Sequence, residues 1–344
     1  MKKTALFATL AISFSIVSTL SAQDASVLPR IAAPTDWKTT NLPAQLITLP
    51  IVCGLNSKIY LRPNVPELFA GPISMLTLDG DAKLIHPANG TGFPRVYTMP
   101  FNADSAGNFF AVIQPVNGVQ WYLAAYDNEG NFKWQNPIAE RFTPTLLLPI
   151  RNDRFIIGGV RVEGSNGSFK AVSVVALFDK KGTKLKSLSL SDDDADVQLQ
   201  GAGAFNRAIQ YGIAAAGPDG LNYVFRASAH PKVQVLDADG NVLRILSLTP
   251  MSDDAWPTNF FVLGNAIAVA YLESKADGVC LTEANLTVYS SDTGEAMANY
   301  RIPVKGILAC PQRDFLVFLS ANKGEANYHL ARTALPPNSL TCPR

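Results

Sequence analysis

Apolar and polar residues alternate in short segments along most of the chain, and tight turns separate these segments. Alternation with a period of two predicts β-strands. One unit recurs: a strand, a turn containing Asp or Ser and then Gly, and a second strand. Aspartate or serine accepts a backbone hydrogen bond in such a turn, and glycine supplies the positive φ that the turn requires. The recurring unit is therefore a β-hairpin, and its turns end at Gly80, Gly130, Gly182, Gly240 and Gly294.

The spacing of these hairpins predicts the architecture. The turn glycines are 50, 52, 58 and 54 residues apart, and such a period with about four short strands is typical of a propeller blade. The clearest repeat predicts strands over 143–150, 154–162, 170–178 and 183–190, with a loop at 163–167. A two-sheet sandwich would not require a hairpin in every interval. We therefore expect an all-β fold, a β-propeller of six four-stranded blades, with seven blades as the alternative.

Partial repeats at both ends predict how the ring closes. Residues 43–87 make a first blade, and residues 306–337 supply at least three strands of a sixth. The fourth strand of that blade is expected from the N-terminal stretch around 27–33 or from 340–344. Closure is expected because each blade buries its faces only against its neighbours. We assign 23–42 to an N-terminal segment, one of the two candidates to close the last blade, and 43–344 to the propeller domain.

Strand aromatics such as Phe109, Phe225 and Phe260 are expected to fill the wedges between blades, because large side chains are needed there. No helical periodicity longer than two turns follows the first 22 residues. The core is therefore expected to lie between the sheets of the ring.

Residues 1–22 have the order of a secretory signal peptide. Lys2 and Lys3 precede an apolar run over 5–20, and the small residues Ser21 and Ala22 follow. This order is typical of a bacterial Sec-type signal, with cleavage after Ala22 or one residue earlier. The run is too short and too rich in Ser and Thr for a membrane anchor. We expect a periplasmic or secreted protein with no stable membrane insertion.

Charge narrows the class of partner. The chain has 29 basic and 28 acidic residues, and removal of the signal takes away two lysines and no acid. The mature chain therefore has a net charge near −1. A nucleic-acid or anionic-membrane partner would require a basic stripe, which is missing from the sequence.

Four cysteines remain after cleavage, and an even number in an exported protein predicts disulfides with three possible connectivities. Cys53 and Cys310 occupy matching positions in the first and last blades, so a bond between them would close the ring. Cys280 and Cys342 would then form the second pair. Bonds from Cys53 to Cys280 or to Cys342 remain the alternatives. No Cys-x-x-Cys occurs, so the spacing does not indicate zinc or redox chemistry.

A resemblance to known propellers lies in the same turns. Around Ala125, Asp127, Gly130 and Trp134 the chain resembles the repeat of quinoprotein-like propellers, and the other copies are similar to repeats of six-bladed NHL and lactonase-type propellers. The resemblance implies the architecture and little about activity. A bound quinone would imply a calcium site and a catalytic carboxylate, whose motifs are not found, and the Ser-x-Asp-x-Gly-x-x-Trp order of sialidase repeats is also missing.

Candidate site residues follow from where propellers usually bind ligands, which is the face where each outer strand connects to the next inner strand. The predicted connections there are 86–96, 136–142, 191–208, 249–257 and 303–305. The longest carries Asp192, Asp194 and Asp196, and the next carries Asp254 and Trp256. Carboxylates from neighbouring blades suit Ca²⁺, so Asp194, Asp196 and Asp254 are the predicted calcium ligands. The alternative is a solvated acidic loop.

Three further residues complete the predicted ligand-binding set. Trp256 is the best candidate for an aromatic ligand contact, because a loop carries it. His86 and His230 also lie in predicted loops, although a histidine followed by proline is more often a surface turn residue than a catalytic base. No catalytic residue is assigned.

These features favour an exported, non-catalytic binding or scaffold protein. Its ligand or partner, an extracytoplasmic protein, peptide or glycan, is expected at the loops around the channel mouth. The alternative is a calcium-dependent hydrolase of lactonase or glycosidase type, because a propeller hosts both classes. The binding role is preferred since no catalytic constellation stands out in the sequence.

Overall fold

The computed structural model describes residues 31, 33–43, 47–54, 58–63, 69–165, 168–188, 212–226, 231–250, 255–274, 281–302, 307–311, 315–320 and 327–334. Twenty-four strands, β1 to β24, lie in these ranges, and they pair into six antiparallel sheets of four strands. The described part of the chain contains no helix of a length and hydropathy that would cross a membrane.

Each sheet is one blade, and five of the six follow the order of the chain. Blade 1 contains β2 (Ile47–Cys53), β3 (Ile59–Pro63), β4 (Ile73–Leu76) and β5 (Ala82–Ile85). Blade 2 contains β6 (Val96–Ala103), β7 (Phe109–Pro115), β8 (Tyr122–Tyr126) and β9 (Phe132–Pro137). Blade 3 contains β10 (Thr143–Ile150), β11 (Arg154–Ser165), β12 (Ser168–Asp179) and β13 (Lys184–Ser187).

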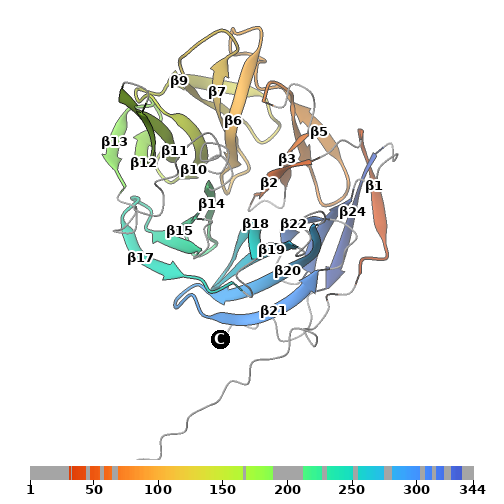
Figure 1. Cartoon of the computed structure of the whole chain (residues 1–344). Coiled ribbons are helices and arrows are strands. Elements are labelled where there is room, and N and C mark those ends of the chain that lie inside the picture. The colour runs from red at the N-terminus through yellow and green to blue at the C-terminus, as the bar shows by residue number, and fades with distance from the viewer. Residues whose placement is uncertain are drawn as a thin grey trace, which may run out of the picture.

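The remaining blades complete the ring. Blade 4 contains β14 (Gly212–Ala216), β15 (Asn222–Arg226), β16 (Lys232–Leu236) and β17 (Val242–Ser247). Blade 5 contains β18 (Ala255–Leu263), β19 (Ala266–Ser274), β20 (Leu281–Ser290) and β21 (Ala296–Ile302). Blade 6 contains β22 (Ile307–Pro311), β23 (Phe315–Ser320), β24 (Asn327–Ala334) and β1 (Trp37–Pro43). The sheets surround a common centre, with β2, β6, β10, β14, β18 and β22 innermost (Figure 1). The fold is a six-bladed β-propeller, as the repeat predicts.

The N-terminal segment supplies the closing strand. β1 pairs antiparallel with β24, and Trp37 lies opposite Ala331; the two strands lie side by side in Figure 1. The closing strand is thus 37–43, almost wholly within the N-terminal segment 23–42, and not the stretch around 27–33. An outer strand meets water on its free edge and needs few apolar residues, which is why its pattern is weak.

Aspartate side chains shape the turns between the third and fourth strands, as the turn chemistry predicts. In blade 2, Asp127 Oδ1 accepts the backbone N–H of Asn131 at 2.8 Å, and Oδ2 accepts the Asn131 side-chain amide at 3.1 Å. Lys133 and these hydrogen bonds hold the pKa of Asp127 well below its usual range. Asp237 and Asn241 make the same pair of bonds in blade 4, at 2.7 and 2.8 Å.

The turn glycine of blade 3 also joins neighbouring blades. Gly182 has a φ of +79°, and a Cβ there would lie 2.0 Å from the carbonyl oxygen of Pro137 in blade 2. The backbone N–H of Ala139 donates to the Gly182 carbonyl at 3.1 Å. Glycine is therefore required both by the turn and by the close approach of blade 2.

The core lies between the blades, because successive residues of a strand point to opposite faces. In β3, Ile59 and Leu61 pack in the cluster shared with blade 6, whereas Tyr60 packs in the cluster shared with blade 2. The strand aromatics fill the spaces between blades, as expected. Phe225 of blade 4 stacks on Phe260 of blade 5, with ring centroids 5.0 Å apart.

The loop predicted at 163–167 in blade 3 is wrong for residues 163–165, which belong to β11, while residues 166 and 167 lie outside the described residues. β11 and β12 pair without interruption from Arg154 opposite Asp179 to Ser165 opposite Ser168. The outer part of this hairpin projects into solvent, since Arg161 and Val162 are exposed. The polar residues at this end of the hairpin give the sequence the appearance of a loop, although they belong to a strand.

Candidate functional site

The structure describes only part of the predicted site. Asp192, Asp194, Asp196, His230 and Asp254 lie outside the described residues. The calcium ligands predicted among them are therefore still a prediction. Among the residues that the structure does describe, no group of three or more His, Cys, Asp or Glu side chains is arranged to hold a metal ion.

The remaining two predicted residues lie on described backbone. Trp256 belongs to β18, where it is opposite Leu272, so the prediction that a loop carries it is wrong; the Pro257 that follows it reads as a loop signal in the sequence. His86 is exposed and follows β5, the outer strand of blade 1. Its connection contacts the outer strand of blade 2, since the Gln135 side-chain amide donates to the Thr91 carbonyl at 2.9 Å. His86 therefore lies near the outer edge of the ring.

Buried asparagines join the inner strands. The Asn102 side-chain amide in β6 donates to the carbonyls of Leu147 in β10 and Ala214 in β14, both at 2.9 Å. Asn259 in β18 donates to the Leu308 carbonyl in β22 at 3.4 Å. Each asparagine follows a register shift in its strand, which turns the polar side chain towards neighbouring blades. These bonds fix the inner strands relative to one another.

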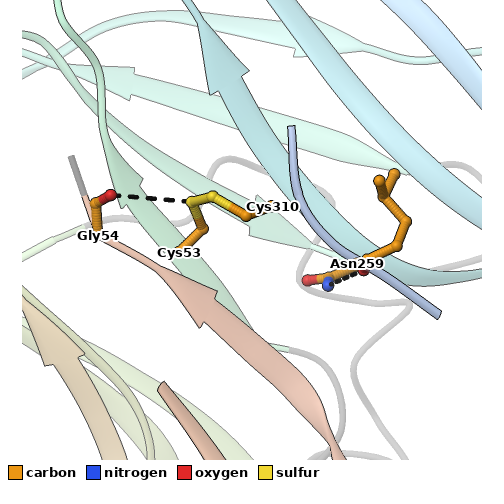
Figure 2. The surroundings of a disulfide bond; sticks show 5 residues. Cys53, Gly54, Asn259 and Cys310 are labelled. Carbon is orange, nitrogen blue, oxygen red and sulfur yellow. Dashed lines mark hydrogen bonds between the residues drawn. A yellow bond between two sulfur atoms is a disulfide. The ribbon is translucent and has the colours of Figure 1, made fainter. Parts of the chain in front are cut away.

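A disulfide joins the inner strands of the first and last blades. It links Cys53 in β2 to Cys310 in β22, with Asn259 beside it (Figure 2). This is the pairing indicated by the matching positions of the two cysteines. Cys280 and Cys342 lie outside the described residues. A disulfide across a buried junction is typical of a protein from an oxidising compartment.

Tyrosines at the junction of blades 4 and 5 form a neutral hydrogen-bonded chain. The Tyr289 hydroxyl donates to the Thr249 carbonyl at 3.0 Å and lies 2.8 Å from the Tyr271 hydroxyl. Burial raises the pKa of both phenols above their usual range. Both stay protonated at neutral pH, so this chain is a structural contact between blades.

Arg62 is different because it is both charged and buried. It follows Ile59, Tyr60 and Leu61 in β3, and by alternation it shares the face of Tyr60, towards blade 2. Only 7% of Arg62 is exposed. Burial lowers the pKa of Arg62 to about 10, so the guanidinium is still charged at neutral pH.

Aromatic rings flank the guanidinium of Arg62. Its central carbon lies 4.9 Å from the centroid of Phe69 and 5.5 Å from the centroid of Phe101. Nη2 donates to the Met99 carbonyl at 2.5 Å. No carboxylate among the described residues pairs with it, and desolvation is the cause of its lowered pKa.

A bulge in β6 positions the blade 2 residues that contact Arg62. The register of β6 on β7 shifts between Thr98 and Phe101, and the Thr98 N–H donates to the Phe69 carbonyl at 2.6 Å. Phe69, Met99 and Phe101 are all half-buried. Arg62 pairs with Thr48, next to the first residue of inner strand β2. The site therefore lies at the end of the ring where inner strands begin, which is the face expected to bind ligands.

Sequence reasoning did not identify Arg62. A usable signal is present, because a charged residue directly follows three apolar residues in a strand that is buried on both faces. What the sequence does not give is the partner element, since Phe101 and Met99 reach Arg62 only through the packing of blade 2 on blade 1.

Comparison with known proteins supports the architecture and does not identify a family. No protein-family model and no curated protein sequence matches the chain. A protein of unknown function from Dyadobacter fermentans has a similar structure, with a TM-score of 0.51, 10% identity, and coverage of 88% of this chain and 99% of that chain. At this identity the likeness shows the fold alone.

Two further structures are similar at lower scores. One is the β-propeller domain of the Trilobed protease from Pyrococcus furiosus, with a TM-score of 0.46, 10% identity, and coverage of 86% of this chain and 82% of that chain. The other is regucalcin, a calcium-binding protein from Agrobacterium tumefaciens, with a TM-score of 0.47, 13% identity, and coverage of 89% and 96%.

Proposed function

We propose that this chain is an exported, non-catalytic binding or scaffold protein. Its partner, an extracytoplasmic protein, peptide or glycan, binds at the face where the inner strands begin. The observation that carries the proposal is the double closure of the ring, by β1 on β24 outside and by Cys53–Cys310 inside. A frame closed in this way holds its connecting segments at fixed relative positions, which is how rigid scaffolds present binding loops.

Export is supported by the signal-like order of residues 1–22 and by the disulfide. Expression of the full chain in a bacterial host, followed by fractionation and mass spectrometry, tests it. The expected product lies in the periplasm or medium and begins at Ala22 or Gln23. An uncleaved chain in the cytoplasm would contradict this part of the proposal.

Binding is tested with the mature chain on printed glycan and peptide arrays. The triple variant Asp192→Asn, Asp194→Asn, Asp196→Asn is expected to lose or change the signal. Asp81→Asn is the matched control, because Asp81 is exposed in the turn between β4 and β5, at the opposite end of the strands. Arrays without a reproducible signal, or a triple variant that binds like the wild type, would count against a partner at these loops.

The hydrolase alternative is tested separately with lactone, aryl-ester and aryl-glycoside substrates, each with calcium and with a chelator. The proposal expects no turnover and no calcium-dependent shift in the melting temperature. Turnover that requires calcium would replace the binding role with the hydrolase.

A further inference from the structure

Arg62 holds a positive charge inside the protein with few partners. Its guanidinium has five N–H donors, and the Met99 carbonyl is the acceptor that the described residues provide. Buried charges in proteins are usually paired with an opposite charge. Among the described residues, no anion completes this arrangement.

The surroundings of Arg62 define the shape of that anion. Phe69 and Phe101 lie within cation–π distance of the guanidinium. The remaining donors form the planar fork that matches a carboxylate. Around this fork, Phe69, Met99 and Phe101 keep part of their apolar surface exposed. An apolar group attached to the carboxylate would contact these three side chains.

A second arginine shows what a satisfied arginine looks like in this protein. Arg332 donates to the Leu78 carbonyl at 2.8 Å and lies over the Phe315 ring at 5.3 Å. In contrast to Arg62, it is 45% exposed and pairs with Asp79 at 3.5 Å. Arg332 is partly exposed to solvent and pairs with a carboxylate, whereas Arg62 is buried and has no carboxylate partner among the described residues.

We propose that Arg62 binds the carboxylate of a ligand that carries an apolar group beside it, at the junction of blades 1 and 2. This inference rests on the proposed binding role and gives the chemical class of the ligand. The carboxylate accepts two hydrogen bonds from the guanidinium, and the apolar group packs on Phe69, Met99 and Phe101.

Calorimetric titration of the mature chain tests the proposal with two pairs of probes. The first pair is 3-phenylpropionate and its amide, and the second is N-acetyl-phenylalanine and its amide. The carboxylates are expected to bind at least about tenfold more tightly than the amides, because a charge-assisted pair is lost. Binding of N-acetyl-phenylalanine alone indicates the C-terminus of a peptide, and binding of 3-phenylpropionate indicates a free acid.

Variants connect the binding to Arg62. Arg62→Met is expected to abolish carboxylate binding, and Arg62→Lys to weaken it about tenfold because lysine lacks the planar fork. Arg332→Met is the matched control and is expected to bind like the wild type. Circular dichroism melts establish that each variant is folded. Lack of binding by every probe, equal binding of acids and amides, or unchanged binding in Arg62→Met would each overturn the proposal.

Glu67 is the competing internal carboxylate, since it is close to Arg62 in sequence and lies outside the described residues. Glu67→Gln is expected to leave carboxylate binding unchanged. Binding that appears only in this variant would identify Glu67 as the natural partner of Arg62 and overturn the proposal. Array signals that survive Arg62→Met while the probes fail would remove this inference and leave the proposed function intact. Probe binding that Arg62→Met abolishes, without any array signal, would leave this inference intact and count against a partner at the loop around Asp192.

Discussion

Blade 1 meets its two neighbours through arginines in similar settings. Arg332 of blade 6 donates to the Leu78 carbonyl of blade 1, and Arg62 of blade 1 donates to the Met99 carbonyl of blade 2. Each guanidinium also lies near a phenylalanine ring. The arginines differ in solvent and counter-charge: Arg332 is partly exposed and pairs with Asp79, whereas Arg62 is buried without a described carboxylate.

The two arginines therefore affect stability differently. The Arg332 contact is compatible with a stable junction of blades, whereas burial of the Arg62 charge lowers the free energy of unfolding. An exposed ion pair contributes little to stability, because water already solvates both charges. A buried charge without a partner destabilises the folded state. The junction of blades 1 and 2 is therefore held mainly by its apolar contacts, together with neutral hydrogen bonds such as that from the Thr98 N–H to the Phe69 carbonyl. Arg62 requires a reason other than stability.

The largest expected effect comes from the apolar contacts of that junction. Phe109 is fully buried and lies 5.4 Å from Tyr60 and 5.6 Å from Tyr126, measured between ring centroids. Phe109→Ala should lower the free energy of unfolding by about 3–5 kcal/mol, measured by urea denaturation. Val119→Ala, in the exposed connection between β7 and β8, is the control with an expected change within about 0.5 kcal/mol. A small loss in Phe109→Ala would mean that Arg62 holds the junction after all.

The second largest loss of stability is expected from removal of the disulfide between blades 1 and 6. The double variant Cys53→Ser, Cys310→Ser should lower the free energy of unfolding by about 2–4 kcal/mol, because the bond closes a long loop in the unfolded chain. Reductant should destabilise the wild type similarly and leave the double variant unchanged. Equal stability of the two proteins without reductant would show that β1 on β24 closes the ring unaided.

The fold was accessible from the sequence because its signals are local. The Asp127 and Asp237 turns satisfy their own hydrogen bonds within five residues, so each hairpin is encoded where it forms. The closing strand was harder, since β1 is recognisable only through its pairing with β24. Its residues carry the weak alternation of a strand with one edge in water.

The Arg62 site was not accessible in the same way. Phe69 and Phe101 lie on different blades, and they meet at Arg62 across a bulge in β6. Pro100 marks that bulge in the sequence, but nothing in the sequence shows which elements it brings together. Charge alone directs attention to the acidic loop around Asp192 and Asp194. Such groups stand out in a sequence, whereas a single arginine in an apolar strand is noticed only once its burial is known.

A substitution at Arg62 is expected to stabilise the protein, in contrast to Phe109→Ala and the cysteine double variant. Arg62→Met should raise the free energy of unfolding of the ligand-free protein by about 1–3 kcal/mol, because the cost of burying a charge disappears. Burial lowers the pKa of Arg62 to about 10 in the folded state, well below its ordinary value in the unfolded chain. Below pH 10 the group is charged in both states, so the wild type bears the full cost. Above pH 10 the folded protein releases the Arg62 proton before the unfolded chain does, and the cost declines as the pH rises.

The stability difference between Arg62→Met and wild type should therefore be constant from pH 7 to 9 and shrink above pH 10. Urea denaturation of both proteins at matched pH measures it, and tyrosine and lysine titrations cancel because both proteins contain them. If Arg62→Met were less stable than the wild type by more than about 1 kcal/mol at pH 7, Arg62 would be a residue that stabilises the junction of blades 1 and 2.

The smallest effect is expected at Arg332. Its pair with Asp79 spans 3.5 Å, with Arg332 partly exposed and Asp79 largely exposed, so Arg332→Met should lower the free energy of unfolding by about 0.5 kcal/mol or less. This loss should shrink further at high salt, because salt screens exposed charges, whereas the change in Arg62→Met should depend little on salt since that guanidinium is buried. Urea denaturation at low and high ionic strength measures both, with Asp79→Asn as the matched variant. A salt-independent loss above about 1 kcal/mol in Arg332→Met would show that the exposed arginine fastens blade 6 to blade 1, and burial would then no longer distinguish the two arginines.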